Sequence, residues 1–484
     1  MGRAGHDIRY IVLSDLHLGD KDSVLTSLSE EGHVDPLTAG PALSALIACL
    51  RDLVRHNEGS DAPTLVLNGD MVELAFGSVS GALNTFKRLA ELLFEPGQEL
   101  CDRILFLPGN HDHHLWEMAR ETQYRMEVAN VRLPEGGLPA PRHVTRLDPD
   151  ACVPSLLLNT VLGHVQHDEH LDEAKHEVGI LYPNMALVSR ELDRAVLLHH
   201  GHYVERLYHF FSRLRRLVFP ERALPATVSE IEAENFAWID FVWSLFGRSG
   251  GAGEDVQRIF DMLLYPERTR ALAVGLAERT APVVKMPFLP MRWMREFVLK
   301  HVFRRIAARA GTERTKFHVV CSPETLAGTE AYLFGPTFRQ LKEEFGFVPS
   351  DLTFLFGHTH KPFERVLEGG DPQRTVQVYN SGGWVVDALE PDPAFGGSLL
   401  LLSNDLDVAC LRVFNDGESD AHYQPTVRSA GSAAAPGSFA ARVQGLIEGP
   451  RGTPGDPWAT LSAALRSEVA LRRRHHRERR HSGA

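Results

Sequence analysis

Short apolar runs alternate with longer amphipathic segments through the first part of the chain. The runs at residues 8–14, 64–67 and 104–107 have the length of buried strands, and apolar residues recur at helical spacing over about 40–57 and 81–93. Each run ends in polar or turn-forming residues, which places loops at the strand ends. This alternation predicts an α/β fold in which those loops carry the function.

The same alternation resumes later in the chain. Further strands are predicted at residues 155–162, 185–189, 195–198, 352–356 and 375–379, with a helix over 337–345 and a hairpin of 399–402 and 408–413. Together these runs extend the predicted sheet structure to about residue 413.

From Tyr203 to about Lys316 the apolar spacing becomes helical. Ser229 followed by Glu232 has the pattern of a capping box that opens a helix. A helix from about Pro290 combines basic residues with an apolar stripe. That pattern is typical of a helix on anionic lipid, through residues 288–310, and equally of a helix that buries its stripe in a lid.

Beyond Asn415 the chain is rich in Ala, Gly, Ser and Pro, which predicts disorder. Its arginine and histidine run at 471–481 suits either an acidic surface or a solvated tail. We therefore expect a core of residues 1–202 and 317–414, a helical insertion of 203–316 and a basic tail of 415–484.

The charge is unevenly spread. The formal net charge is −12, but residues 203–316 hold 19 basic against 13 acidic residues and residues 415–484 hold ten against seven, so the rest carries −21. An acidic body suits the binding of metal cations, and basic appendages suit an anionic surface, although exposed charge also serves solubility alone.

Five widely spaced cysteines without a C-x-x-C pair suggest neither a disulfide framework nor a zinc knuckle. No apolar run reaches about 18 residues, and the N-terminus lacks the pattern of a signal peptide. We expect a cytoplasmic protein, with any membrane contact peripheral and at the inner face.

Carboxylate, amide and imidazole side chains follow five of the predicted strands. They are Asp15 and His17, then Asp70, then Asn110 and His111, then His200, then His358 and His360. Such donors without thiolates suit Mn, Fe, Zn or Co. A carboxylate can bridge two cations about 3.5 to 4 Å apart, and such a pair supports phosphate ester hydrolysis. A second group, His164, His167, His170 and His176, suits either an accessory metal site or a solvated loop.

The ordered motifs D-L-H, N-G-D, G-N-H-D, H-G-H and G-H-T-H resemble those of the calcineurin-like metallophosphoesterase superfamily, over residues 8–202 and about 317–413. The resemblance implies a four-layer α/β/β/α sandwich of two mixed sheets and two divalent metal ions. It assigns the first metal to Asp15, His17, Asp70 and His360, and the second to Asp70, Asn110, His200 and His358.

In the run H-H-G-H the resemblance favours His200, because the family's ligand directly precedes the glycine. His111 would stay off the metals, contact the phosphate and protonate the leaving oxygen after attack by a metal-activated hydroxide. Either Glu73 or Asp112 would orient its ring. The stretch from Asn380 to Trp384 resembles a structural loop of the family.

The long insertion between His200 and His358 departs from compact members of the superfamily. The UDP-2,3-diacylglucosamine hydrolases carry a helical cap at this place and a similar D-L-H-L run, but tend to lack the histidine of G-N-H-D. We expect a phosphoesterase that acts on a phosphomonoester, phosphodiester or pyrophosphate of a small molecule or lipid-linked substrate, with no nucleic-acid partner. The alternatives are a nucleotide or cyclic-nucleotide phosphodiesterase, and a non-catalytic scaffold at the membrane.

Overall fold

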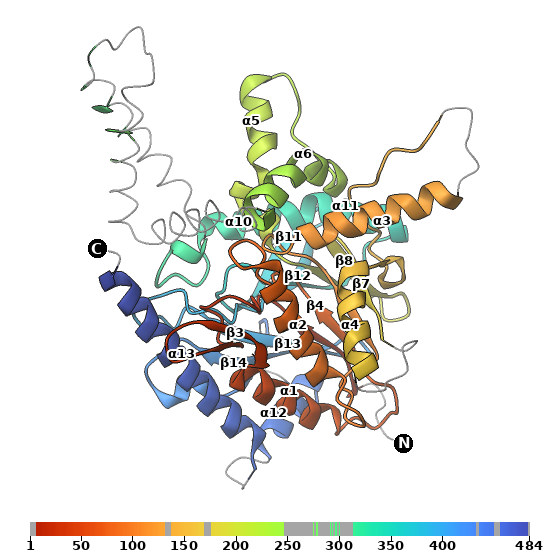
Figure 1. Cartoon of the computed structure of the whole chain (residues 1–484). Helices are drawn as coiled ribbons and strands as arrows, with labels where there is room; N and C mark the ends of the chain where they lie inside the picture. The colour runs from red at the N-terminus through yellow and green to blue at the C-terminus, as the bar shows by residue number, and fades with distance from the viewer. Residues whose placement is uncertain are drawn as a thin grey trace.

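The computed structural model describes residues 6–130, 137–168, 176–245, 313–431, 435–449 and 455–482, together with residues 274, 277–278, 291, 293, 296–297 and 300. Within these residues the strands form two large sheets and a short hairpin of β2 (Thr26–Leu28) and β3 (Val34–Ala39). The expectation of a mixed α/β sandwich is confirmed, and Figure 1 shows the sheets between two groups of helices.

The first sheet has the order β15-β14-β13-β1-β4-β5-β7-β6. Its centre is parallel and consists of β1 (Ile8–Leu13), β4 (Thr64–Leu67), β5 (Arg103–Phe106) and β7 (Val178–Ile180). Antiparallel strands flank this centre: β13 (Gly396–Ser403), β14 (Val408–Asn415), β15 (Thr426–Arg428) and β6 (Val153–Pro154). The predicted hairpin is thus β13 and β14.

The second sheet has the order β11-β12-β10-β9-β8. Its three central strands are parallel: β9 (Arg194–His199), β10 (Asp351–Phe356) and β12 (Arg374–Asn380). The edges are antiparallel, with β8 (Asn184–Ser189) on one side and β11 (Phe363–Gly369) on the other. All of the strands predicted for this sheet are present.

Three apolar clusters hold four layers together. Between the sheets, Val12 and Val66 pack with Leu198 and Leu355. Outside the first sheet lie α1 (Pro41–Val54), α2 (Val79–Leu93), α3 (His114–Asn130), α4 (Leu156–Asp168), α12 (Phe439–Glu448) and α13 (Pro457–Ser482). Outside the second lie α6 (Val228–Asp240), α10 (Pro323–Tyr332) and α11 (Phe338–Phe345), with α5 (Phe210–Val218) packed on α6. The site is therefore built where the two sheets face each other.

Two local expectations are wrong. Residues 155–162 were expected as a strand but lie mostly in α4, because Leu158, Leu162 and Val165 recur at helical spacing and bury one face. The capping box of α6 is formed by Thr227 and Glu230, not by Ser229 and Glu232, because the helix begins two residues earlier.

The structure also corrects the expected disorder of residues 415–484. They contain β15, α12 and α13, and α13 packs against α1. Trp458, Leu461, Leu465 and Val469 are buried at helical spacing, so this apolar stripe outweighs the small and polar composition around it. Buried Arg472 donates to the backbone oxygens of Ser23 and Thr26, so the tail belongs to the folded core.

The basic amphipathic helix of residues 288–310, predicted either to lie on anionic lipid or to belong to a lid, falls almost entirely outside the described residues. Among the helices that the structure does describe, none has the length and apolar character needed to cross a membrane.

Candidate metal centre

The site lies at the carboxyl ends of adjacent parallel strands in both sheets. Asp15 and His17 follow β1, Asp70 follows β4, and Asn110 and His111 follow β5. From the second sheet, His200 follows β9, while His358 and His360 follow β10. Because carboxyl ends of neighbouring parallel strands share an edge, segments far apart in sequence meet here.

The loops at these strand ends have unusual backbone conformations. Eight non-glycine residues among those described have positive φ, and five of them are Asp15, His17, Asp70, His358 and His360. Side chains other than glycine rarely adopt this region, and such strain concentrates at functional sites. The loops are therefore shaped to aim these side chains.

Glycines let the loops approach one another. A Cβ on Gly69 would lie 2.2 Å from Nδ1 of His200, one on Gly109 would lie 2.3 Å from Oδ1 of Asp70, and one on Gly357 would lie 2.0 Å from Oδ2 of Asp15. The glycines of N-G-D, G-N-H-D and G-H-T-H thus provide the space in which the polar side chains meet.

One group of donors joins β1 to β10. The Nε2 atoms of His17 and His360 lie 3.1 Å apart, and Nε2 of His360 lies 3.5 Å from Oδ1 of Asp15. The backbone N–H of His358 donates to both carboxylate oxygens of Asp15, at 2.9 and 3.0 Å. Asp15, His17 and His360 are close enough together to hold a metal ion.

A second group joins β4 and β5 to the other sheet. Nε2 of His200 lies 3.2 Å from Oδ2 of Asp70, 3.2 Å from Oδ1 of Asn110 and 3.3 Å from Nδ1 of His358. Asp70, His200 and His358 could likewise hold a metal ion. Oδ2 of Asp70 also lies 3.7 Å from Nε2 of His17, so the same oxygen faces both groups.

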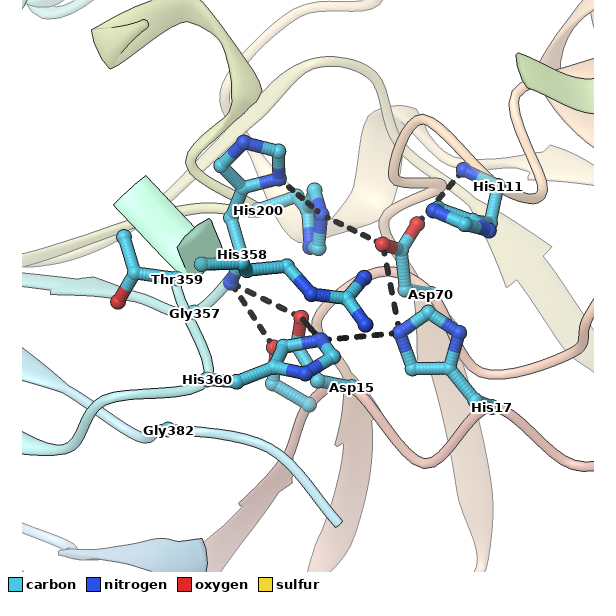
Figure 2. A network of polar contacts seen from close by, with 12 residues as sticks. Asp15, His17, Asp70, His111, His200, Gly357, His358, Thr359, His360 and Gly382 are labelled. Atoms are coloured by element: carbon cyan, nitrogen blue, oxygen red, sulfur yellow. Dashed lines mark hydrogen bonds and ion pairs between the residues drawn. The ribbon is translucent and has the colours of Figure 1, made fainter. Parts of the chain in front are cut away.

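Figure 2 shows these labelled side chains converging on one region, joined by the contacts described above: Asp15, His17, Asp70, His200, His358 and His360.

The second nitrogen of each imidazole faces an acceptor. Nδ1 of His17 donates to Glu73 at 3.0 Å, Nδ1 of His360 to Asp387 at 2.6 Å, and Nδ1 of His200 to the backbone oxygen of Asn68 at 3.1 Å. Nε2 of His358 lies 3.4 Å from Oε2 of Glu205. With these nitrogens protonated, the neutral rings turn lone pairs toward one another, which is the arrangement of histidines that bind a metal.

The pKa shifts fit a cation site. Burial lowers the pKa of His17 and, with the charge of Arg314, lowers that of His360 to about 3. Burial raises the pKa of Asp15 to about 7. For His200 burial acts against protonation, yet the carboxylates of Asp70 and Asp15 raise its pKa to about 9, so a proton and a metal cation compete for the same position. The donors present therefore fit divalent cations.

His111 lies beside this cluster and is held by Glu73. Nδ1 of His111 lies 2.9 and 3.1 Å from the two oxygens of Glu73, and its backbone N–H donates to Oδ1 of Asp70 at 2.8 Å. Burial acts against protonation, but the charges of Glu73 and Asp70 raise the pKa of His111 to about 9. Of the two residues expected to orient this ring, the geometry favours Glu73.

Asp112 has a different place. Its oxygens accept hydrogen bonds from the backbone of Gly109 at 2.7 Å and of Met71 at 2.7 Å. The side chain thus ties the loop after β5 to the loop after β4 and fixes the position of Asp70. The hydrogen bonds that it accepts within the described residues come from backbone N–H groups and not from the His111 ring.

The neighbouring histidines and the Asn380 loop also have defined places. Both ring nitrogens of His199 are buried without a hydrogen-bond partner among the described residues, and Nε2 of His202 contacts the hydroxyl of Tyr182 at 3.2 Å. In the Asn380 loop, the backbone N–H of Trp384 donates to the backbone oxygen of Asp15 at 3.1 Å. The loop thus packs against the site as a structural element.

The structure describes the second histidine group only in part, so the accessory metal site stays a prediction. His170 lies outside the described residues, His164 is exposed on α4, and the ring of His176 packs on Phe94 with ring centroids 4.2 Å apart.

Several residues at the site belong to no sequence motif and were not predicted. Glu205 contacts His358, Asp387 accepts from His360, and Arg314 pairs with Asp387. From the insertion, Ser244 donates to the backbone oxygen of Asn110 at 2.8 Å, and the ring of Trp243 lies 6.0 Å from that of His111. Only contact in the fold identifies these residues, because each is a common residue type in an unremarkable stretch.

Residues 8–221 match the family model described as calcineurin-like phosphoesterase. No curated protein matches the chain at a significant level. The matched region includes the loops of Asp15, Asp70, Asn110 and His200, and the structure adds those of His358 and His360 to the same centre.

Proposed function

Because the chain belongs to the calcineurin-like metallophosphoesterase superfamily, we propose that it hydrolyses a phosphate ester with two divalent metal ions. Asp15, His17, Asp70 and His360 would hold one ion, and Asp70, Asn110, His200 and His358 the other. When bound, such ions lower the pKa of a water molecule and neutralise charge on the phosphoryl group. Mn, Fe, Zn and Co all suit this set of imidazole, carboxylate and amide donors.

The observation that carries the proposal is the position of Asp70. Its Oδ2 faces His17 of one group and His200 of the other, while its Oδ1 accepts from the backbone of His111. One carboxylate therefore links both groups of donors to the loop of the candidate acid. A purely structural loop would not need donors from the ends of three other strands, β1, β5 and β9, directed at a single carboxylate.

His111 supplies the proton chemistry in this proposal. Glu73 and Asp70 favour its protonated form, and Glu73 accepts from Nδ1, so Nε2 is the atom left to donate to the leaving oxygen. The insertion closes the same space, because Tyr208 packs on His358 with ring centroids 5.1 Å apart and Trp243 lies beside His111. We propose that it is a lid that selects the substrate.

The test uses nitrophenyl mono- and diesters with Mn. Asp70→Asn should lower metal content and abolish turnover, since it removes the shared charge. His111→Ala should keep its metal and lower kcat by about 10² to 10⁴, the usual contribution of a general acid. His176→Ala, which changes a histidine stacked on Phe94, is the control and should behave as wild type. Wild-type activity in Asp70→Asn would refute the proposed metal centre. Wild-type activity in His111→Ala would refute its role as the general acid.

The substrate class can be tested in the same Mn-dependent hydrolysis assay with other phosphoesters. A nucleotide, a cyclic nucleotide and a lipid pyrophosphate assayed side by side distinguish a lid that accepts a base from one that accepts an acyl chain. Absence of turnover on every phosphoester, with Mn bound, would favour the scaffold alternative.

A further inference from the structure

Arg314 is a largely buried cation that lies near the end of the insertion, next to the metal centre. It lies in the short helical turn Glu313–Thr315, and its side chain is 13% exposed. Nε and Nη2 both donate to Oδ1 of Asp387, at 3.2 and 2.5 Å. The other oxygen of Asp387 accepts from Nδ1 of His360, so a single carboxylate links Arg314 to a metal-ligand histidine.

The guanidinium has donors left over. It carries five N–H bonds, and Nη1 makes no hydrogen bond to any residue within the described ranges. Its charge also acts on Asp20, Asp70, His111 and Tyr208. By direct contact, Arg314 is one carboxylate away from His360, whose Nε2 lies 3.5 Å from Oδ1 of Asp15. Arg314 is therefore held at the edge of the metal centre, where the phosphoryl group would lie in the proposed reaction.

A set of buried polar contacts fixes the backbone at Arg314. Nζ of Lys361 is buried and donates to three backbone oxygens, those of Glu313 at 2.8 Å, Lys316 at 2.5 Å and Val319 at 2.8 Å. An ammonium group has three donors, so all of them are used to hold this one segment. Lys361 directly follows His360, which ties the position of Arg314 to the metal ligand.

Glu313 strengthens the same attachment. Its backbone N–H donates to Oε1 of Glu205 at 2.6 Å, and its carboxylate accepts from Ser322 and Thr325. Glu205 in turn faces His358. The segment around Arg314 is thus attached to both histidines of the G-H-T-H motif. Such pre-organisation suits a residue that must bind an anion in a fixed geometry.

Holding Asp387 uses only Nε and Nη2 of Arg314, so Nη1 is left over for another acceptor. Beside two divalent cations its positive charge is unfavourable unless an anion lies between them. A guanidinium can donate two parallel N–H bonds to the non-bridging oxygens of a phosphoryl group. We propose that Arg314 binds the phosphoryl group of the substrate, so that the insertion completes the phosphate subsite; this inference rests on the proposed phosphoesterase function.

The test measures the binding of inorganic phosphate to the Mn-loaded protein by calorimetry, together with KM and kcat on a nitrophenyl ester and metal content. Arg314→Ala should weaken phosphate binding by about 10- to 100-fold, as expected for loss of hydrogen bonds to a charged group. KM should rise, and metal content should stay unchanged. Arg314→Lys should recover part of the affinity, because it keeps the charge and loses the paired donors.

The matched control is Arg194→Ala. Arg194 also donates to a carboxylate, Asp351, at 2.8 Å, but it lies at the start of β9, at the opposite end of that strand from His200. It should leave phosphate affinity unchanged. Unchanged phosphate affinity in Arg314→Ala, or loss of metal in place of phosphate, would overturn the role of Arg314 alone. A wild-type protein that binds no Mn and hydrolyses no ester would instead overturn the proposed function.

Discussion

The buried pair of His113 and Glu232 predicts how strongly the insertion is coupled to the loop that carries His111. His113 lies two residues after His111, and its Nε2 is 3.0 Å from Oε1 of Glu232 on α6. Both side chains are fully buried, and Oδ1 of Asp240, the last residue of α6, lies 3.5 Å from Nδ1 of His113. The other oxygen of Glu232 accepts from the hydroxyls of Tyr182 and Tyr203.

We expect Glu232→Gln to lower the free energy of unfolding by about 3 kcal/mol. Removing one partner of a buried ion pair costs about 3 to 5 kcal/mol, and glutamine keeps an acceptor for the two tyrosine hydroxyls, which favours the lower end. Glu234→Gln on the same helix is the control. Glu234 pairs with Arg215 at 2.6 Å, both partly exposed, so its loss should cost no more than about 1 kcal/mol.

The cost should depend on pH in a defined direction. Burial acts against protonation, but the charges of Glu232 and Asp240 raise the pKa of His113 to about 10, above about 6.5 in the unfolded chain. A raised pKa stabilises the fold fully below pH 6.5, and this stabilisation falls as pH rises from about 6.5 to 10. The difference between wild type and Glu232→Gln should shrink over that range.

Urea unfolding at pH 6, 8 and 9.5, followed by tryptophan fluorescence, measures both effects. Two results would refute a charged His113 as the link between α6 and the loop of His111. One is an equal loss of unfolding free energy in Glu232→Gln and Glu234→Gln, and the other is a difference between wild type and Glu232→Gln that grows with pH.

Two further predictions concern the site glycines and the C-terminal helices. Gly69→Ala should weaken metal binding by at least about tenfold, because the new Cβ would lie 2.2 Å from the His200 ring. The control is Gly97→Ala, also at positive φ but with nothing within 4 Å of the added Cβ, which should leave metal binding unchanged. Equal metal affinities in the two variants would contradict this prediction. Leu465→Ala should cost about 2 to 5 kcal/mol in urea unfolding, because Leu465 is fully buried where α13 packs on α1. The neighbouring Arg466→Ala, in an exposed pair with Asp420, should cost less than about 1 kcal/mol, and a similarly small cost for Leu465→Ala would mean that α13 adds little to the core.

The sequence predicts the central elements and their donors because both signals are local. An apolar run long enough for a strand, followed at once by Asp15 and His17 or by Asp70, identifies the strand and its loop together. The sandwich order follows from the family resemblance, and the structure shows it through the packing of Val12 on the opposite sheet. The sequence does not predict the residues that hold these donors in place, because they belong to no motif.

Asp387 and Glu205 show why those partners cannot be predicted. Asp387 lies 27 residues after His360, which it orients, and Glu205 lies 153 residues before His358. No periodicity connects such pairs, and a carboxylate is common at any surface. For the tail, average composition gave the wrong prediction. Gly, Pro and Ser around residues 429–437 suggest disorder for the whole segment, although Trp458, Leu461, Leu465 and Val469 of α13 are buried.

The attachment of the insertion explains how the core carries so long a segment. Glu205 near its beginning accepts a hydrogen bond from the backbone of Glu313 near its end, so the two ends meet although they are 108 residues apart. The entropic cost of bringing the two ends of a loop together rises only slowly with the length of the loop. Because Glu205 also faces His358 and Arg314 also pairs with Asp387, the junction is part of the metal centre itself. The two ends of the insertion therefore contact, through Glu205 and Asp387, both histidines of the G-H-T-H motif.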